Sequence, residues 1–149
     1  MELVAMRPEN VEEAARLHAL AMAEGLGGPA WSAETFGTLL ATPGTFGWMV
    51  PDRGLILVRH AADEAEIFTI GVAAAARRQG VARTLLETAC IALQALKTER
   101  LLLEVAIDNL PAQRFYESAG FVTAGRRPGY YQRGAARVDA PIMELRLDA

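Results

Sequence analysis

The sequence predicts one α/β layered domain spanning residues 1–149, in which helices flank a single mixed sheet in the order ααβββαβαββ. The chain is long enough to bury one core without disulfide support and leaves no room for a second substrate domain. Hydrophobic residues make up 52% and charged residues 22%, as in ordinary globular proteins. Short β-type runs alternate with segments of helical periodicity, which indicates a sheet covered by helices.

Two helices are expected before the central strands. Residues 8–24 place apolar side chains near helical spacing, with acidic residues in the first turn and Gly25 just beyond the end. Ser32 then provides an N-cap for a second, short helix, which the Pro43-Gly44 pair ends. The N-terminal region therefore supplies a pair of amphipathic helices.

Three strands and a long helix come next. β-type runs occupy residues 45–50, 55–60 and 66–72, and the turn sequences between them favour an antiparallel meander. Residues 81–97 carry the strongest helical periodicity in the chain and predict a helix with one buried face.

The C-terminal part predicts a strand, a helix and a final pair of strands. Residues 101–106 are almost continuously apolar, as in a strand covered on both faces, and the exception is Glu104. Residues 111–119 form a helix, because proline suits its first turn and Gly120 the position after its last. The last strand, 140–147, is expected to pair back across a glycine-containing loop.

Cysteine, histidine and hydropathy patterns exclude several kinds of site. The single Cys90 permits no internal disulfide, and its apolar helical setting favours a buried thiol over a nucleophile. His18 and His60 are too distant in sequence to suggest a ligand pair, so no metal is expected. No apolar run approaches the ~20 residues of a membrane span and the start lacks a secretory pattern, so we expect a cytoplasmic protein.

Charge is divided unevenly along the chain, although the net charge is only -3. Residues 73–137 carry ten Arg or Lys against five Asp or Glu, and the other residues carry five against thirteen. This division suits an anionic ligand at the basic part and a cationic partner at the acidic part, although solvated surface charge produces the same pattern. A pI near 5.4 disfavours direct nucleic-acid binding.

A basic segment with one glycine lies between the end of a strand and the start of the long helix. A helix N-terminus presents unpaired N–H groups and a partial positive charge, and a glycine there lets a phosphate approach the main chain. The segment lacks the Lys-Ser ending of a P-loop and the three glycines of a dinucleotide fold. By itself it is equally consistent with a basic loop. Its residues are Arg77, Arg78, Gln79, Gly80, Val81 and Ala82.

Two motifs together resemble the hallmarks of the GNAT N-acetyltransferase superfamily. The basic segment is similar to the signature Arg/Gln-x-x-Gly-x-Gly/Ala. Residues 109–121 resemble the second hallmark, Asn-x-x-Ala-x-x-(Phe/Leu)-Tyr-x-x-x-Gly-Phe. Both motifs occur in the order and secondary-structure context of that family. The resemblance implies the GNAT fold, in which a mixed, mostly antiparallel central sheet is flanked by helices.

The C-terminal half looks most like the RimI group, whose members acetylate the N-terminal amine of a ribosomal protein. The similar stretches include residues 103–105, 115–121, 130–131 and 139–143. The resemblance implies an acyltransferase that moves an acetyl group directly from acetyl-CoA to a protein N-terminal α-amine. A small-molecule amine acceptor and a non-catalytic acyl-CoA-binding module remain alternatives, and the sequence does not indicate an oligomeric state.

The resemblance also implies roles for individual residues. Glu104 would be the general base and Tyr116 the general acid, roles that a carboxylate and a phenol of pKa ~10 permit. An α-amine, with a pKa of ~8, is easier to deprotonate than a lysine. Asn109 would contact the coenzyme, with helix N-capping as an equal alternative. The strand that offers backbone groups to the pantetheine arm and thioester carbonyl is matched by Ile70, Gly71 and Val72.

Three aromatic residues are candidates for acceptor binding. Tyr130 and Tyr131 fall in the expected loop before the last strand, where relatives close over the acceptor, but covering the core is an equal alternative. Trp31 offers either a substrate wall or a hydrophobic staple at a helix start. The presence of both Glu104 and Tyr116 favours catalysis over binding alone.

Overall fold

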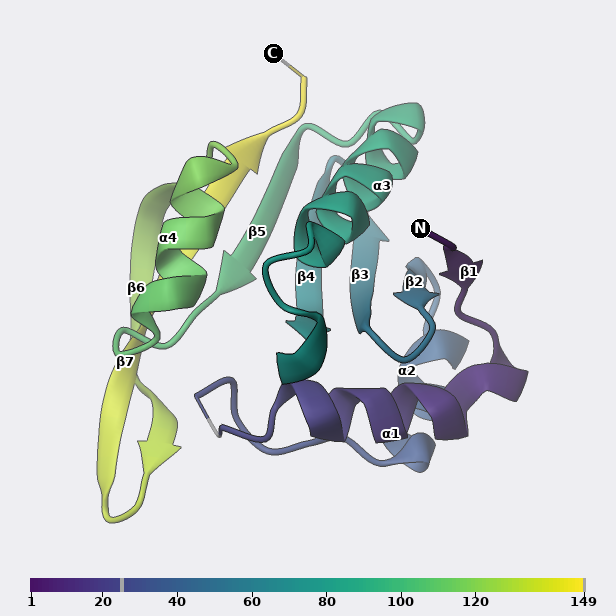
Figure 1. Cartoon of the computed structure of the whole chain (residues 1–149). Coiled ribbons are helices and arrows are strands. Elements are labelled where there is room, and N and C mark those ends of the chain that lie inside the picture. Colours follow the sequence, from purple (N-terminus) through teal and green to yellow (C-terminus); the bar gives the residue numbers. More distant parts are fainter. Residues whose placement is uncertain (25, 149) are drawn as a thin grey trace.

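The computed structural model describes residues 1–24 and 26–148, so Gly25, expected to follow the first helix, lies outside them. Within the described residues seven strands form one sheet, in the order β1-β2-β3-β4-β5-β7-β6, and only the β4–β5 pair is parallel. The predicted fold class is confirmed (Figure 1). The strands are β1 (Val4–Ala5), β2 (Thr45–Val50), β3 (Gly54–Ala61), β4 (Glu64–Val72), β5 (Arg100–Glu104), β6 (Val122–Arg133) and β7 (Ala136–Arg146). The helices are α1 (Val11–Ala21), α2 (Ala33–Ala41), α3 (Val81–Ala95) and α4 (Leu110–Ser118), with 3₁₀ turns η1 (Pro8–Asn10) and η2 (Ala74–Ala76).

Helices cover both faces of the sheet, and each face has its own core (Figure 1). Strand β3 shows the division, because Ile56 and Val58 pack in the core with α3 and α4, whereas Leu55 and Leu57 pack with α1 and α2. All four side chains are buried, so the strand is apolar at consecutive positions rather than at alternate ones. None of the helices in the described residues is both long and apolar enough to cross a membrane.

The parallel pair β4 and β5 separates part of the way along the sheet. Residues 64–66 of β4 pair with residues 100–102 of β5, and beyond them the two strands diverge (Figure 1). On its other side β4 stays paired with β3, through an irregular register at Phe68 that leaves one extra residue in β4. One edge of β4, from Ile67 to Val72, therefore lacks a strand partner in the described sheet, and the opening beside it is where the candidate site lies.

The last two strands are longer than the sequence predicts. Tyr130 and Tyr131, expected in a loop, lie on β6, and β7 begins at Ala136. The Pro128-Gly129 pair, a local loop signal, sits in an irregular part of the β6–β7 register, and Gly129 has a φ of 57°. Pairing resumes beyond this irregularity, so the segment remains in the hairpin despite its turn-like sequence.

The N-terminal region also differs in detail from its prediction. α1 covers residues 11–21 rather than 8–24, because the first expected turn is the 3₁₀ turn η1. The short strand β1, which no sequence pattern indicated, pairs with β2 through Val4 and Ala5. These differences lie at the ends of α1 and at the edge of the sheet, and they do not alter the layers.

Gly47 on β2 is expected to be one of the least replaceable glycines. A Cβ at this position would lie 2.2 Å from the Ile56 backbone oxygen, so a side chain would push β2 away from β3. Gly47→Val should lower the free energy of unfolding by about 3 kcal/mol, as overpacking of a rigid core does. Gly37→Ala in α2, where an added Cβ meets nothing within 4 Å, should raise it by up to about 1 kcal/mol. Urea denaturation followed by circular dichroism measures both, and equal stabilities would contradict this account.

Candidate active site

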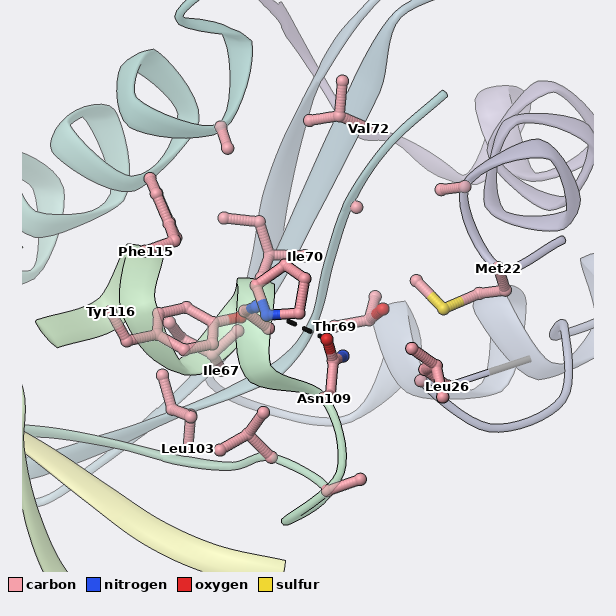
Figure 2. A pocket seen from close by; sticks show the side chains of 18 of the residues that line it. Met22, Leu26, Ile67, Thr69, Ile70, Val72, Leu103, Asn109, Phe115 and Tyr116 are labelled. Atoms are coloured by element: carbon pink, nitrogen blue, oxygen red, sulfur yellow. Dashed lines mark hydrogen bonds between the residues drawn. The ribbon is translucent and has the colours of Figure 1, made fainter. Parts of the chain in front are cut away.

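The opening between β4 and β5 contains a cavity of about 550 Å³, here called the main cavity (Figure 2). Its walls come from β4, the end of β5, the starts of α3 and α4, and the segment after α1. Most residues predicted for the site are brought together here. Those that line the main cavity are Ile70, Gly71, Val72, Arg77, Arg78, Gly80, Val81, Ala82, Glu104, Asn109, Tyr116 and Tyr131.

The N-terminus of α3 forms one end of the main cavity. Gly80 is the N-cap residue with a φ of 79°, a conformation that favours glycine because it has no Cβ. No side chain of residues 1–24 or 26–148 makes a cap hydrogen bond to this 15-residue helix, so its first N–H groups are open to an outside acceptor. Together with the helix dipole, these groups make a suitable site for a phosphate.

Two predicted members of this segment are held by other protein groups. Arg77 forms a two-pronged ion pair with Glu24, with one N–O distance of 3.0 Å, and its Nε donates to the Val72 carbonyl. The hydrogen bond with Arg77 lowers the pKa of Glu24. Gln79 does not line the main cavity, and its amide lies 3.4 Å from the Ala75 carbonyl oxygen. The guanidinium of Arg77 thus ties the segment after α1 to the end of β4.

Glu104 ends β5 and places a little-exposed carboxylate at the opening. Its side chain is 12% exposed and forms an ion pair with Arg127 on β6. A side-chain hydrogen bond with Glu104 raises the pKa of Tyr130. The pKa of Glu66 is raised mainly by partial burial and, to a smaller extent, by the negative charge of Glu104. The carboxylate of Glu104 is suited to accept a proton from an amine that enters the opening.

A second cavity of about 260 Å³, here called the side cavity, adjoins the same opening. Four residues line the side cavity but not the main cavity, namely Trp31, Leu39, Glu66 and Tyr130. The residues that line both cavities are Ile67, Phe68, Glu104 and Tyr131. The two cavities therefore adjoin along these four residues, of which Glu104 is the one with an ionisable carboxyl group, and two substrates could meet there.

Tyr116 and Asn109 enter the main cavity from α4 and the residue that caps it. The Tyr116 ring is buried, packs edge-on against Phe115 and Phe121, and points toward the middle of the cavity (Figure 2). Burial raises the pKa of Tyr116, so its phenol keeps its proton at neutral pH. The Asn109 side-chain oxygen accepts a hydrogen bond from the Ala112 amide at 3.3 Å, so Asn109 acts as the helix N-cap.

Trp31 forms the hydrophobic staple that one of its two sequence interpretations suggested, and it also lies at the side cavity. It lies before the N-cap Ser32 and contacts Phe36 at 5.5 Å between ring centroids, as a hydrophobic staple does. It also lines the side cavity and stacks on the His18 ring at 4.8 Å. Its indole is therefore a structural wall that a bound acceptor could touch.

Residues that sequence reasoning did not select hold the rim of the main cavity. Arg133 on β6 donates to both carboxylate oxygens of Asp108, at 2.8 and 2.9 Å, and to the Leu26 carbonyl at 2.8 Å. Its guanidinium also lies over the Tyr131 ring, 5.5 Å from the centroid. This arginine connects three segments distant in sequence, so no local pattern could have indicated it. The contact between His18 and Thr69, which lines the main cavity, also joins segments distant in sequence, so no local pattern indicated it.

Comparison with known proteins agrees with this geometry. The model of the acetyltransferase (GNAT) family matches residues 12–121. The [Ribosomal protein bS18]-alanine N-acetyltransferase of Escherichia coli K12 is 42% identical over 83 residues, which are 56% of each chain. The Haemophilus ducreyi protein of the same name is 40% identical over 86 residues, 57% of this chain and 59% of its own length. The matched stretch thus spans little more than half the length of these curated relatives.

Solved structures extend the likeness to nearly the whole chain. The ribosomal-protein-S18-alanine N-acetyltransferase from Escherichia coli superposes with a TM-score of 0.85 and 29% identity, covering 98% of this chain and 93% of that one. Chaetomium thermophilum Naa20, solved with a bisubstrate analogue, shares the fold with a TM-score of 0.82 and 19% identity, over 99% of this chain and 87% of that one. The family match covers well over half of the sequence, and the chain belongs to the acetyltransferase (GNAT) family.

Proposed function

We propose that the protein transfers an acetyl group from acetyl-CoA to the N-terminal α-amine of a protein, and that a ribosomal protein is the acceptor. The observation that carries this proposal is the meeting of two cavities at Glu104, with Tyr116 on the wall of one of them. The names of the relatives support the same acceptor class.

The main cavity is proposed to hold acetyl-CoA along its length. Arg78 and the first N–H groups of α3 would bind the diphosphate beside Gly80. The unpaired edge of β4, residues 67–72, would bind the extended pantetheine arm as a neighbouring strand does. Backbone N–H groups on that edge are also suitable donors for the thioester carbonyl oxygen.

Glu104 and Tyr116 are proposed to move the two protons of the reaction. Glu104 accepts the proton of the incoming ammonium, directly or through water, so that the neutral nitrogen can attack the thioester carbonyl. The carbon–sulfur bond then breaks as Tyr116 donates its phenolic proton to the departing thiolate, and the second proton that the nitrogen loses on forming the amide returns through water to Tyr116. Transfer is direct, with no acyl-enzyme.

The side cavity supports a protein N-terminus as the acceptor. Its volume of about 260 Å³ accommodates a small first residue between Trp31 and Tyr130. The carboxylates of Glu66 and Glu104 favour the arrival of a cationic amine followed by basic residues, as a ribosomal protein provides.

Mass spectrometry of acetylated peptides tests the proposal. One peptide carries a free N-terminal alanine, and a matched peptide is blocked at its N-terminus and contains an internal lysine. Incubation with acetyl-CoA should acetylate only the free N-terminus, because its amine has a pKa of ~8 against ~10.4 for lysine. Modification of lysine alone would overturn the proposed acceptor class. Transfer to neither peptide, with transfer to a small amine from a panel, would assign a metabolite acceptor.

A further inference from the structure

His18 on α1 is a buried titratable residue that the proposed reaction does not use. It is 2% exposed, stacks on Trp31 and meets the edge of Phe36 at 5.5 Å. The Trp31 backbone N–H donates to its Nδ1 at 3.0 Å, and its Nε2 lies 3.0 Å from the Thr69 hydroxyl. Both nitrogens therefore have partners, and one of these partners belongs to the wall of the main cavity.

The contacts of His18 decide which nitrogen carries its hydrogen. A backbone N–H can only donate, so Nδ1 must accept and cannot be protonated. Burial lowers the pKa of His18 to about 4, so the ring is neutral near pH 7. The single ring hydrogen is therefore on Nε2, and it is donated to the oxygen of Thr69.

The hydroxyl of Thr69 is left with a hydrogen to give. Its oxygen already accepts from His18, and among residues 1–24 and 26–148 no other partner accepts its hydrogen. Thr69 lies on β4 just beyond the irregularity at Phe68, where β5 has diverged, and its side chain is among those that line the main cavity (Figure 2). The cavity thus contains an oriented side-chain donor close to where the strands part.

We propose that His18 is a positioning residue that holds the Thr69 hydroxyl as a hydrogen-bond donor to the acyl carbonyl oxygen of acetyl-CoA. The inference rests on the proposed acetyl transfer. An acyl oxygen gains negative charge as the amine attacks, so a donor already oriented by a buried ring stabilises the transition state. The acceptor ammonium has only N–H donors and cannot accept the hydrogen of the Thr69 hydroxyl. Thr69 also does not line the side cavity, where the acceptor is proposed to bind. The hydroxyl is therefore assigned to the acyl oxygen rather than to the acceptor.

Two substitutions at Thr69 test the donor itself. Thr69→Val removes the hydroxyl at nearly constant volume and should lower kcat by about 10²-fold, the typical loss for one oxyanion donor. The KM for the amine should stay unchanged, and calorimetry should show weaker binding of acetyl-CoA with unchanged binding of CoA. Thr69→Ser keeps a hydroxyl within reach of His18 and should retain most of the wild-type kcat.

Two substitutions at His18 test the positioning role. His18→Asn keeps an acceptor near the Nδ1 position for the Trp31 amide but cannot reach Thr69, whereas His18→Gln keeps a donor near the Nε2 position. We expect His18→Asn to lower kcat and His18→Gln to retain more of it. In the Thr69→Val background, His18→Asn should cause no further loss of kcat, because the two residues act through one hydrogen bond.

The outcomes separate this inference from the proposed function. If the wild-type protein does not bind acetyl-CoA, the proposed function fails and the inference fails with it. If the wild type transfers acetyl groups and Thr69→Val keeps its kcat, only the inference is overturned. A rise in the KM for the amine without a fall in kcat would likewise overturn it, since the hydroxyl would then belong to acceptor binding. Additive losses in the double variant would reduce His18 to a structural residue.

Discussion

Glu104→Gln is expected to lower kcat/KM for a peptide acceptor near pH 7 by about 10²- to 10⁴-fold, the range that general bases contribute. The amide keeps the shape of the side chain but cannot accept a proton. As pH rises past the α-amine pKa of ~8, more acceptor is already neutral, so the loss should shrink. Steady-state rates of CoA release across this pH range measure the effect.

Glu66→Gln provides the matched control for this prediction. Glu66 lines the same side cavity as Glu104, so its amide variant removes a negative charge there without removing the proposed base. We expect it to raise the KM for a basic peptide by less than about tenfold, as loss of one exposed charge does, and to leave kcat almost unchanged. Equal losses of kcat in the two variants would show that the site needs negative charge rather than a base at Glu104.

Tyr116→Phe is expected to lower kcat by about 10²-fold or more, because the thiolate would then leave without a proton donor. The phenol is buried against Phe115 and Phe121, and the substitution keeps the ring in the same packing. The affinity for CoA and the melting temperature should therefore remain close to those of the wild type. Stopped-flow or steady-state assays with saturating peptide measure the change in kcat.

A different outcome would reassign Tyr116. If Tyr116→Phe keeps its kcat and binds CoA more weakly, the phenol serves binding rather than proton transfer. If the variant loses both stability and activity, the hydroxyl supports the core. A comparison with Phe121→Leu, which reduces the same packing but leaves the phenol, separates these cases.

Local sequence signals predicted the elements that carry the site. The helix expected at residues 81–97 is α3, Val81–Ala95. It could be predicted because a glycine marks its start and its apolar residues recur at helical spacing. The helix expected at 111–119 is α4, which Asn109 caps at its start and which ends at the C-cap Ala119, just before Gly120 with its positive φ of 101°. The β6–β7 hairpin was predicted less well, since strand pairing with β7 outweighs the local loop signal of Pro128 and Gly129.

The parts of the site that the sequence could not predict depend on distant segments. The splay of β4 from β5 arises from pairing that ends at Glu66, which no residue pattern marks. His18, Thr69 and Arg133 look like ordinary helix and strand residues. Only the fold brings Thr69 to the main cavity and places His18 and Arg133 against residues that line it. The positions assigned to Glu104 and Tyr116 rest on the motif resemblance, and their roles stay predictions.

Acetyl-CoA and an α-amine are proposed to meet through the opening between β4 and β5. A crystal structure with a bisubstrate compound, CoA joined through an acetyl linker to the N-terminus of a short peptide, tests it directly. We expect the diphosphate at the start of α3 beside Gly80, the linker between Glu104 and Tyr116, and the first peptide residue in the side cavity near Trp31. A compound bound with its linker away from Glu104, or with its peptide outside the side cavity, would contradict it.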